Sequence, residues 1–412
     1  MFSDAIKPAF IIAEYNPFHN GHKYHIEKTR ENGATHIIAV MSGNFVQRGD
    51  IAVCDKHTRA KAALLGGADL VLELPVKYAV SNASYFAKGA VAVIEKTGLS
   101  GMLSFGAKSS VEELIAVAEL SEEKSVKEQI EKISREKGLS YPSAMSFFVK
   151  ENYGENLASV LEDANNTLGI EYIKEAKRQN ARLTFSTIER LGTSHDSLEK
   201  TENIASAMSV RNELYKKYNS QKEQYNLYNI KNFLPESALQ VYEQAIKSFD
   251  MPVSKEKFEL IALSRLYSYD AEYFAKINNV SHGLENKILK ALQEKCTLAE
   301  VYDEIKSKRY THARVRQIIL NAVLGISRDL LDQDIGYVRI LGHNEKGREI
   351  LRLIKETQTV DFISNLSEVD TSNKTSAGAL QADMLAGRLF ELCKPVPKKA
   401  NSDFSTKPII IK

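Results

Sequence analysis

The chain of 412 residues is too long for one ordinary compact unit, so we expect two or three domains. Hydrophobic residues make up 43% of it and charged residues 26%, and no run approaches the roughly 18 consecutive apolar residues of a membrane helix, which predicts a soluble globular protein without a membrane role. The net charge of +2 neither requires nor excludes a polyanionic partner, so the places where basic residues cluster matter more.

The start of the chain and its cysteines indicate a compartment. Residues 1–4 (MFSD) include an acid and lead straight into a strand, without a basic segment and an apolar signal core, so we expect a cytoplasmic protein. Cys54, Cys296 and Cys393 are far apart and odd in number, which fits neither a disulfide framework nor a compact metal knuckle. We expect them to be reduced, buried thiols.

Short apolar runs alternate with amphipathic stretches over the first two hundred residues, which is typical of the strands and crossover helices of a parallel sheet. The expected strands are Ala9–Ala13, His36–Met41, Asp69–Leu74, Met102–Phe105 and Arg182–Ile188. The expected helices are Gly21–Asn32, Thr58–Leu65, Ser84–Lys96 and Val111–Ser134. We therefore predict a Rossmann-like α/β domain over residues 1–203, in which ligands bind beyond the carboxyl ends of the strands.

Strand signals then fade, and apolar residues recur at helical spacing, which predicts a helical domain over residues 204–330. A small C-terminal α/β segment is expected over residues 331–412. Its elements would be a strand at Tyr337–Leu341, a turn at residues 342–344 and a helix at Lys346–Thr357.

The four residues His19-Asn20-Gly21-His22 lie where the first expected strand gives way to the first expected helix. A helix N-terminus presents unpaired amides and a partial positive charge, and a glycine there lets a phosphate approach closely. Two histidines add donors that stabilise charge on phosphate oxygens while a nucleophile displaces pyrophosphate. The motif therefore predicts an ATP-using enzyme that reacts at the α phosphorus. The alternative is that one histidine caps the helix and the other is an ordinary surface residue.

HNGH after a strand resembles the HxGH signature of the nucleotidyltransferase superfamily, which is shared with class I aminoacyl-tRNA synthetases. Longer stretches are more specific: EYNPFHNGH, MSGNFVQRGDIAVCDKHTRAKAALLGGADLVLELP, LSFGA, ANNTLGIEYIK and TIERLGTSHD. Together they resemble the bacterial tRNA(Met) cytidine acetate ligase family over most of the chain. The resemblance implies a ligase that activates acetate with ATP as acetyl-adenylate and acetylates the exocyclic amine of the wobble cytidine of elongator tRNA(Met). His19 and His22 would be its catalytic residues.

The same resemblance implies an ATP site. Gly106 would approach the nucleotide by its backbone, Arg190 would reach a phosphate, and Asn165 or its neighbour Asn166 would contact the nucleotide. The full expected set is Ile12, Ala13, Glu14, Tyr15, Asn16, Pro17, Phe18, His19, Asn20, Gly21, His22, Lys23, Tyr24, His25, Gly106, Asn165, Asn166, Arg190, Ser206 and Arg211. The alternatives are that Gly106 only turns the chain and that Arg190 only forms a surface ion pair.

The segment 205–211, ASAMSVR, resembles the second superfamily motif, ISSTxIR, which opens a helix and holds the outer phosphates. Ser206 and Arg211 keep residue types that bond phosphate, whereas Ala207 and Met208 replace a hydroxyl pair. The alternative for Ser206 is a plain helix cap, since serine before an amphipathic run is a common N-cap. The chain has no KMSKS-like loop, which argues against an aminoacyl-tRNA synthetase.

A polar cluster after the second expected strand is a candidate pocket for acetate as the second substrate. It consists of Gln47, Arg48 and Asp50, with Asp55, Lys56 and Arg59 close by in sequence. The alternative is a structural ion pair between Arg48 and Asp50. We expect Mg²⁺ to accompany ATP, where it usually bridges phosphate oxygens and keeps several waters, and the sequence contains no dedicated metal cluster.

Basic residues cluster with an aromatic one in the stretch from Lys306 to Gln317, as in a surface that follows phosphates and stacks on a base. The expected tRNA contacts are Lys308, Arg309, Tyr310, Arg314 and Arg316. The alternative is a solvated helix face. Two rival functions are a small-molecule adenylyltransferase and a noncatalytic RNA-binding protein with a nucleotidyltransferase fold.

Overall fold

A computed structural model of the protein describes residues 6–189, 205–216, 227–307 and 310–412. Its main strands are β1 (Pro8–Ala13), β2 (His36–Ser42), β5 (Leu70–Leu74), β6 (Gly101–Gly106), β7 (Leu183–Ile188), β8 (Tyr337–His343), β9 (Asp361–Ile363) and β10 (Ile409–Ile410). In the described part of the chain these eight strands form one sheet in the order β10-β8-β5-β2-β1-β6-β7, with β9 also paired to β8. Two further strands, β3 (Phe45–Val46) and β4 (Asp50–Ile51), form a separate antiparallel hairpin.

The central strands β5, β2, β1, β6 and β7 are parallel neighbours. The chain moves from β1 to β2 and β5 on one side and later to β6 and β7 on the other, so the strand order reverses at β1. In such sheets, ligands bind where the order reverses, beyond the carboxyl ends of the strands. Here that position lies beyond Ala13 of β1 and Gly106 of β6.

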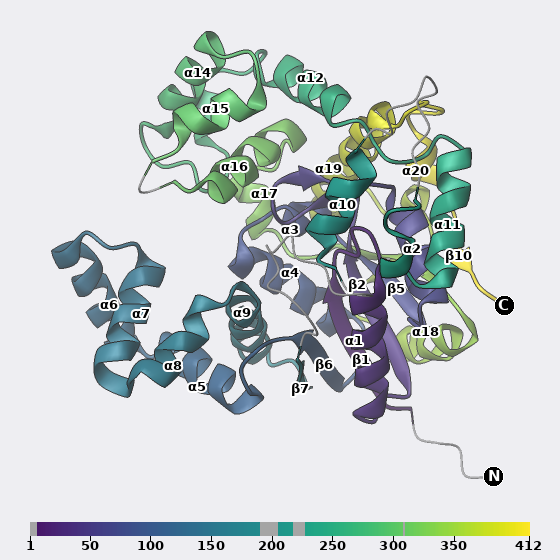
Figure 1. Ribbon diagram of the computed structural model, residues 1–412, viewed down its shortest axis with the longest axis horizontal. Coiled ribbons are helices and arrows are strands. Elements are labelled where there is room, and N and C mark those ends of the chain that lie inside the picture. Colours follow the sequence, from purple (N-terminus) through teal and green to yellow (C-terminus); the bar gives the residue numbers. More distant parts are fainter. Residues whose placement is uncertain (1–5, 190–204, 217–226, 308–309) are drawn as a thin grey trace.

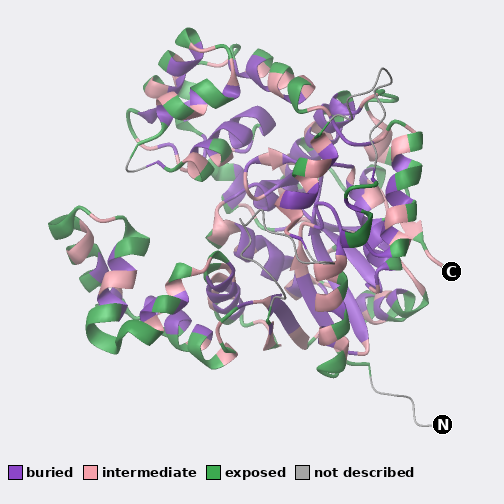
Figure 2. Cartoon of the chain, viewed as in Figure 1, coloured by how far each residue is buried: buried purple, intermediate pink, exposed green. Residues whose placement is uncertain are grey.

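Helices cover both faces of the sheet (Figure 1). Phe10 of β1 belongs to one large apolar cluster, whereas its neighbours Ala9 and Ile11 belong to another. Both faces of the central strands are therefore buried, which explains their nearly continuous apolar sequences. Figure 2 shows this buried centre, with exposed residues gathered on the outer helices. None of the described helices combines the length and the apolar character needed to cross a bilayer.

The helices of the first half are α1 (Asn20–Glu31), α2 (Lys56–Leu65), α3 (Val76–Ala79), α4 (Ala83–Lys96), α5 (Val111–Glu122), α6 (Lys124–Lys137), α7 (Tyr141–Tyr153), α8 (Glu155–Ser159) and α9 (Ala164–Arg178). Those of the second half are α10 (Ala207–Tyr215), α11 (Glu236–Lys247), α12 (Lys255–Leu266), α13 (Ala271–Ala275), α14 (Leu284–Glu294), α15 (Leu298–Ile305), α16 (His312–Leu324), α17 (Arg328–Asp332), α18 (Glu345–Thr357), α19 (Lys374–Cys393) and α20 (Ser402–Ser405). Short 3₁₀ turns are η1 (Val160–Glu162), η2 (Lys231–Phe233) and η3 (Leu366–Glu368).

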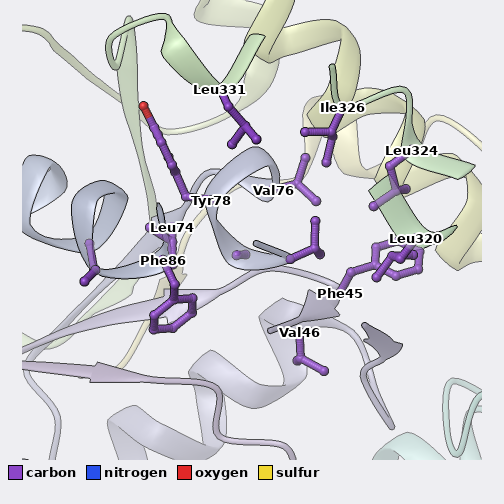
Figure 3. Close-up of a cluster of buried hydrophobic side chains, with 14 of the residues drawn as sticks. Phe45, Val46, Leu74, Val76, Tyr78, Phe86, Leu320, Leu324, Ile326 and Leu331 are labelled. Carbon is purple, nitrogen blue, oxygen red and sulfur yellow. The ribbon is translucent and has the colours of Figure 1, made fainter. Parts of the chain in front are cut away.

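Two groups of helices extend from the sheet in Figure 1: α5 to α8, and a second set that we call the α12–α17 group. An apolar core joins the α12–α17 group to the sheet. Its members include Phe45, Val76, Tyr78, Leu320, Leu324 and Leu331 (Figure 3). Because β3 and α3 share this core with α16 and α17, the helical group has a fixed base beside the carboxyl end of the sheet.

The five strands expected in the first two hundred residues are confirmed to within one residue at each end. The expected helix Val111–Ser134 is wrong as a single helix, because Glu123 adopts an extended conformation between α5 and α6. Helices α7 to α9, which complete this insertion between β6 and β7, were not expected.

The C-terminal segment extends the main sheet, since β8 pairs antiparallel with β5. The turn expected at residues 342–344 is wrong. Gly342 and His343 are bonded within the sheet to β5 on one side and β10 on the other, which satisfies their backbone groups, and Asn344 caps α18. The division into domains at residues 203 and 330 stays a prediction.

Cys54 and Cys393 are buried free thiols, as expected. The same expectation is wrong for Cys296, which is exposed. Cys296 lies in the link between α14 and α15, directly before the N-cap residue Thr297, where the chain runs over the surface.

Candidate active site

Two histidines cap α1. This helix follows β1, which ends with Ile12 and Ala13, and the loop after it. His19 is the N-cap residue, and its Nδ1 accepts a hydrogen bond from the backbone N–H of Gly21 at 3.1 Å. Nδ1 of His22 accepts one from the backbone N–H of His19 at 3.2 Å, and the two rings stack with centroids 3.8 Å apart. This is a reciprocal capping box made of histidines. The alternative interpretation from the sequence was that one histidine caps the helix. In the structure both histidines do so.

These bonds assign the tautomers of the two rings. A ring nitrogen that accepts a backbone N–H carries no proton, so His19 and His22 are neutral with the proton on Nε2. Each ring therefore offers an Nε2–H donor. The two donors are neighbours at a helix N-terminus, where the backbone dipoles add positive potential. Such a pair is suited to binding and stabilising negative charge.

Gly21 allows the His19 ring to fold over the start of the helix. A Cβ at Gly21 would lie 3.0 Å from Cε1 of His19, closer than side-chain carbons normally approach. The N–H of Gly21, which we expected at a phosphate, donates to the His19 ring in this structure. The close approach of the His19 ring is therefore a structural reason for glycine at position 21, in addition to the predicted phosphate contact.

Aromatic side chains support His22. The Tyr15 ring lies edge-on to it at 4.9 Å and the Phe18 ring lies 5.6 Å away, and both are buried. The backbone N–H of Phe18 donates to the hydroxyl of Tyr242 in α11 at 2.7 Å. Burial raises the pKa of Tyr242, so its hydroxyl stays neutral. A residue of the second half of the chain therefore holds the motif in place.

The loop between β1 and α1 is bonded to its surroundings by side chains that we expected at ATP. Oε1 of Glu14 accepts the backbone N–H of Gln47 at 3.0 Å, and Oδ1 of Asn16 accepts that of Val53 at 2.8 Å. The peptide between Asn16 and Pro17 is cis. These contacts fix the backbone that leads into HNGH.

The expected residues further along α1 contact protein. Nε2 of His25 lies 3.0 Å from the hydroxyl of Ser104 in β6 and attaches the helix to the sheet. Lys23 forms an ion pair along the helix at 3.7 Å, and a lysine ammonium lies 5.8 Å from the centre of the Tyr24 ring. Their predicted contacts with ATP stay predictions.

The second motif meets the first. The Arg211 guanidinium in α10 donates to the backbone oxygen of Asn16, three residues before His19, at 2.6 Å. Ser206 accepts the backbone N–H of Ser209 at 3.1 Å as the N-cap of α10, so the cap role is confirmed. The structure thus brings Arg211 beside the histidines.

The two neighbouring asparagines have different roles. The Asn166 carboxamide accepts the backbone N–H of Lys108 at 3.1 Å and donates to the Ser109 hydroxyl at 3.0 Å and the Val160 oxygen at 3.1 Å. These bonds hold the loop after β6. The Asn165 carboxamide makes no hydrogen bond to any described residue, although the residue is only 6% exposed. Asn165 is therefore the better candidate for a nucleotide contact.

Gly106 ends β6 opposite Ile188 of β7, beside the point where the strand order reverses. Its nucleotide contact stays a prediction. Arg190 follows β7 and lies outside the described residues.

The β3–β4 hairpin, our candidate acetate pocket, is attached to the HNGH loop and to α16. The backbone N–H of Gln47 donates a hydrogen bond to Glu14. The backbone oxygen of Gln47 accepts a hydrogen bond from Nε2 of Gln317 at 2.6 Å. Asp50 pairs with Lys255 at 3.5 Å, and the ion pair between Arg48 and Asp50 stays an alternative.

Lys56 and Arg59 are buried and bonded to protein, which contradicts a place for them in a substrate pocket. Nζ of Lys56 lies 2.7 Å from Oε1 of Glu73. Arg59 is 0% exposed and donates to the backbone oxygens of Glu14 at 2.6 Å and Ser42 at 3.1 Å. It joins the loop after β1 to the end of β2.

In the basic stretch, the expected stacking of Tyr310 on a base is wrong. Tyr310 is 6% exposed, its hydroxyl bonds to a serine, and the Arg314 guanidinium lies 4.9 Å from the centre of its ring. The ring is part of the apolar core of the α12–α17 group. Arg316 is exposed and Arg314 partly so, and their tRNA contacts stay predictions. Lys308 and Arg309 lie outside the described residues.

Ser104, Tyr242 and Gln317 contact the site without having been singled out from the sequence. Each lies inside a regular strand or helix, and only the fold brings it to the site. Ser104 is part of the LSFGA stretch, and Gln317 is a polar residue directly before the apolar run of α16.

Known proteins match this chain over nearly its whole length. The sequence model of the HIGH Nucleotidyl Transferase family matches residues 7–405. The chain is 35% identical over 405 residues to the tRNA(Met) cytidine acetate ligase of Thermoanaerobacter sp. (strain X514), covering 96% of this chain and 97% of that protein. It is 33% identical over 415 residues to the protein of the same name from Acetivibrio thermocellus, covering 97% and 99%.

Solved structures match the fold. Apo TmcAL of Thermotoga maritima superposes with a TM-score of 0.89 at 30% identity, covering 98% of this chain and 99% of that one. The same protein bound with alpha-thio ATP gives a TM-score of 0.87 at 31% identity, with the same coverage. Sequence and fold therefore agree from end to end: the chain belongs to the tRNA(Met) cytidine acetate ligase family of the HIGH nucleotidyltransferases.

Proposed function

We propose that this chain activates acetate with ATP as acetyl-adenylate and then acetylates the exocyclic amine of the wobble cytidine of elongator tRNA(Met). The observation that carries the proposal is the stacked His19–His22 pair where the sheet order reverses, in a chain related from end to end to proteins named for this reaction. A relative of the same fold bound with alpha-thio ATP supports ATP as the substrate. We place the reaction in the cytoplasm.

In the first step, a carboxylate oxygen of acetate attacks the α phosphorus, and the bond from that phosphorus to the pyrophosphate oxygen breaks. Acetate is already ionised near neutral pH, so no base is needed. Negative charge grows on the phosphate oxygens, and the Nε2–H groups of His19 and His22 donate to them. The N-terminus of α1 adds its dipole. Arg211, which bonds to the loop before the motif, would bind an outer phosphate.

In the second step, the cytidine amine attacks the carbonyl carbon of acetyl-adenylate. The bond between that carbon and the AMP oxygen breaks, AMP leaves, and the amine loses a proton. Holding amine and anhydride together accounts for much of the rate, and the site must exclude water from the anhydride until tRNA is bound. Arg314 and Arg316 on α16 would bind tRNA phosphates.

The β3–β4 hairpin would hold acetate. A guanidinium matches a carboxylate in shape and charge, so Arg48 is the residue we expect to bind it. The N–H of Gln47 attaches this hairpin to the loop before α1, which supports an acetate site near the α phosphorus.

Magnesium would accompany the triphosphate. The described residues include no group of three or more His, Cys, Asp or Glu side chains placed to hold a metal ion. When bound, it would neutralise phosphate charge.

The proposal is tested by incubating the protein with ATP, labelled acetate and total tRNA, and then digesting the tRNA to nucleosides. The label is expected on cytidine, and His22→Ala should abolish its transfer. Label on no nucleoside, with acetate-dependent exchange of pyrophosphate into ATP retained, would leave acetate activation standing and refute the tRNA step.

A further inference from the structure

A turn over residues 227–230 presents an aromatic side chain to solvent. Leu227 and Ile230 are 5% and 1% exposed and belong to the apolar cluster that also contains residues of β1 and α1. The backbone N–H of Ile230 donates to the oxygen of Leu227 at 2.9 Å and closes the turn. Between these two anchors, Tyr228 is 67% exposed. The position of the tyrosine is therefore fixed while its ring faces outward.

The chain directly after this turn contacts HNGH. Nδ2 of Asn20, the residue after His19, donates to the backbone oxygen of Asn232 at 2.9 Å. Four residues of extended chain span at most about 14 Å, so Tyr228 lies within that distance of Asn232. The Lys231 ammonium lies 4.5 Å from the centre of the Tyr228 ring. An exposed aromatic ring and a cation thus lie within about 14 Å of Asn232, the residue that contacts the start of α1.

We propose that Tyr228 stacks on a tRNA base next to the target cytidine, with Lys231 beside the adjoining phosphate. This inference rests on the proposed function. An enzyme that modifies a base must take it out of its stack, which leaves a neighbouring base exposed. Aromatic side chains cover such bases, and cations follow the backbone. Tyr310, the aromatic residue of the basic stretch, is buried and unavailable for this contact.

The first test separates tRNA use from acetate activation. Tyr228→Ala is expected to raise the KM for tRNA in the acetylation reaction by roughly 5- to 100-fold, the range typical for loss of one stacked base. Acetate-dependent ATP–pyrophosphate exchange without tRNA should stay within about twofold of wild type, because it needs no base stacking. Tyr228→Phe keeps the ring and should restore the KM. The matched control is Tyr153→Ala at the end of α7, where the tyrosine is 52% exposed, and it should behave like wild type.

Three results would overturn the proposal: an unchanged KM for tRNA in Tyr228→Ala, an equal defect in Tyr228→Phe, or an equal loss of exchange activity. A second readout reports the stack directly. An anticodon stem-loop with 2-aminopurine next to the target cytidine should change its emission when wild type binds and not when Tyr228→Ala binds. If wild type transfers no acetyl group but the Tyr228-dependent signal is present, the proposed function fails and the stack stands. If wild type acetylates tRNA and the change in 2-aminopurine emission is the same in Tyr228→Ala, the stacking proposal is refuted and the proposed function stands.

Discussion

Nε2 of Gln317 in α16 donates to the backbone oxygen of Gln47 in the β3–β4 hairpin at 2.6 Å and to that of Ser81 at 3.2 Å. The N–H of Gln47 in turn donates to Glu14, in the loop that leads into HNGH. One glutamine therefore links the α12–α17 group, the candidate acetate pocket and, through Gln47, the loop that leads into HNGH. Residues about 270 positions apart in sequence share one hydrogen bond.

Gln317→Ala is expected to raise the KM for acetate in ATP–pyrophosphate exchange by roughly 5- to 30-fold, because a lost hydrogen bond to a partly buried oxygen costs about 1–2 kcal/mol. The KM for ATP should change little. Exchange rates at varied acetate and ATP give both constants. Gln293→Ala, at an exposed position of α14, is the control. An unchanged KM for acetate in a folded Gln317→Ala protein would place the acetate pocket elsewhere.

The two roles of His19 can be separated by substitution. Asparagine offers an oxygen near the position of Nδ1 and is a good N-cap, but it has no donor at Nε2. His19→Asn should therefore unfold at nearly the wild-type urea concentration and lose about 100- to 1,000-fold in exchange rate, as removal of one charge-stabilising donor does elsewhere.

His19→Gln has its amide near Nε2 and lacks the cap acceptor. It is expected to keep more activity than His19→Asn and to lose about 0.5–2 kcal/mol in the free energy of unfolding. The opposite order of activities would mean that His19 acts through the cap and not through its Nε2–H.

The parts of this fold that follow from the sequence are those governed by local pattern. Strands buried on both faces have continuous apolar sequences, so the sequence predicts their bounds closely. The HNGH motif can likewise be located from the sequence alone, directly after the first strand and its loop. Burial of polar residues depends on distant partners. Arg59 donates to backbone oxygens of the loop after β1 and of the end of β2, and Tyr310 belongs to an apolar core of residues distant in sequence. Neither could be read from neighbouring residues. The antiparallel addition of β8 to β5 likewise depends on pairing over more than 250 residues.

The asparagine pair after η1 gives a matched comparison. Asn165→Ala should raise the KM for ATP several-fold with an unchanged free energy of unfolding, because its carboxamide bonds to no described residue. Asn166→Ala removes the bonds to Ser109 and Val160 and leaves the N–H of Lys108 without its acceptor, and should cost about 1–3 kcal/mol of stability. Urea unfolding and initial exchange rates at varied ATP measure the two effects. If Asn165→Ala leaves the KM for ATP unchanged, the nucleotide contact lies elsewhere.

Asp383 of α19 is a buried carboxylate far from HNGH in sequence. The hydroxyl of Tyr337 donates to its Oδ2 at 2.6 Å, and the backbone N–H of Val76 donates to its Oδ1 at 3.0 Å. Burial, and then the neighbouring carboxylate of Glu73, raise the pKa of Asp383 from 3.8 to about 6. The folded protein therefore binds this proton more tightly than the unfolded chain does.

The stabilisation from that proton is complete below about pH 3.8 and is lost as the pH rises through about 6. Asp383→Asn carries no titrating group at this position. The difference in free energy of unfolding, wild type minus Asp383→Asn, should therefore fall by roughly 1–3 kcal/mol between about pH 4 and pH 7. Urea titrations at several pH values measure it, with Asp361→Asn, at an exposed position of β9, as the control. A difference that stays constant over this range would mean that Asp383 titrates alike in the folded and unfolded chains, and that the Tyr337 and Val76 hydrogen bonds offset both its burial and the charge of Glu73.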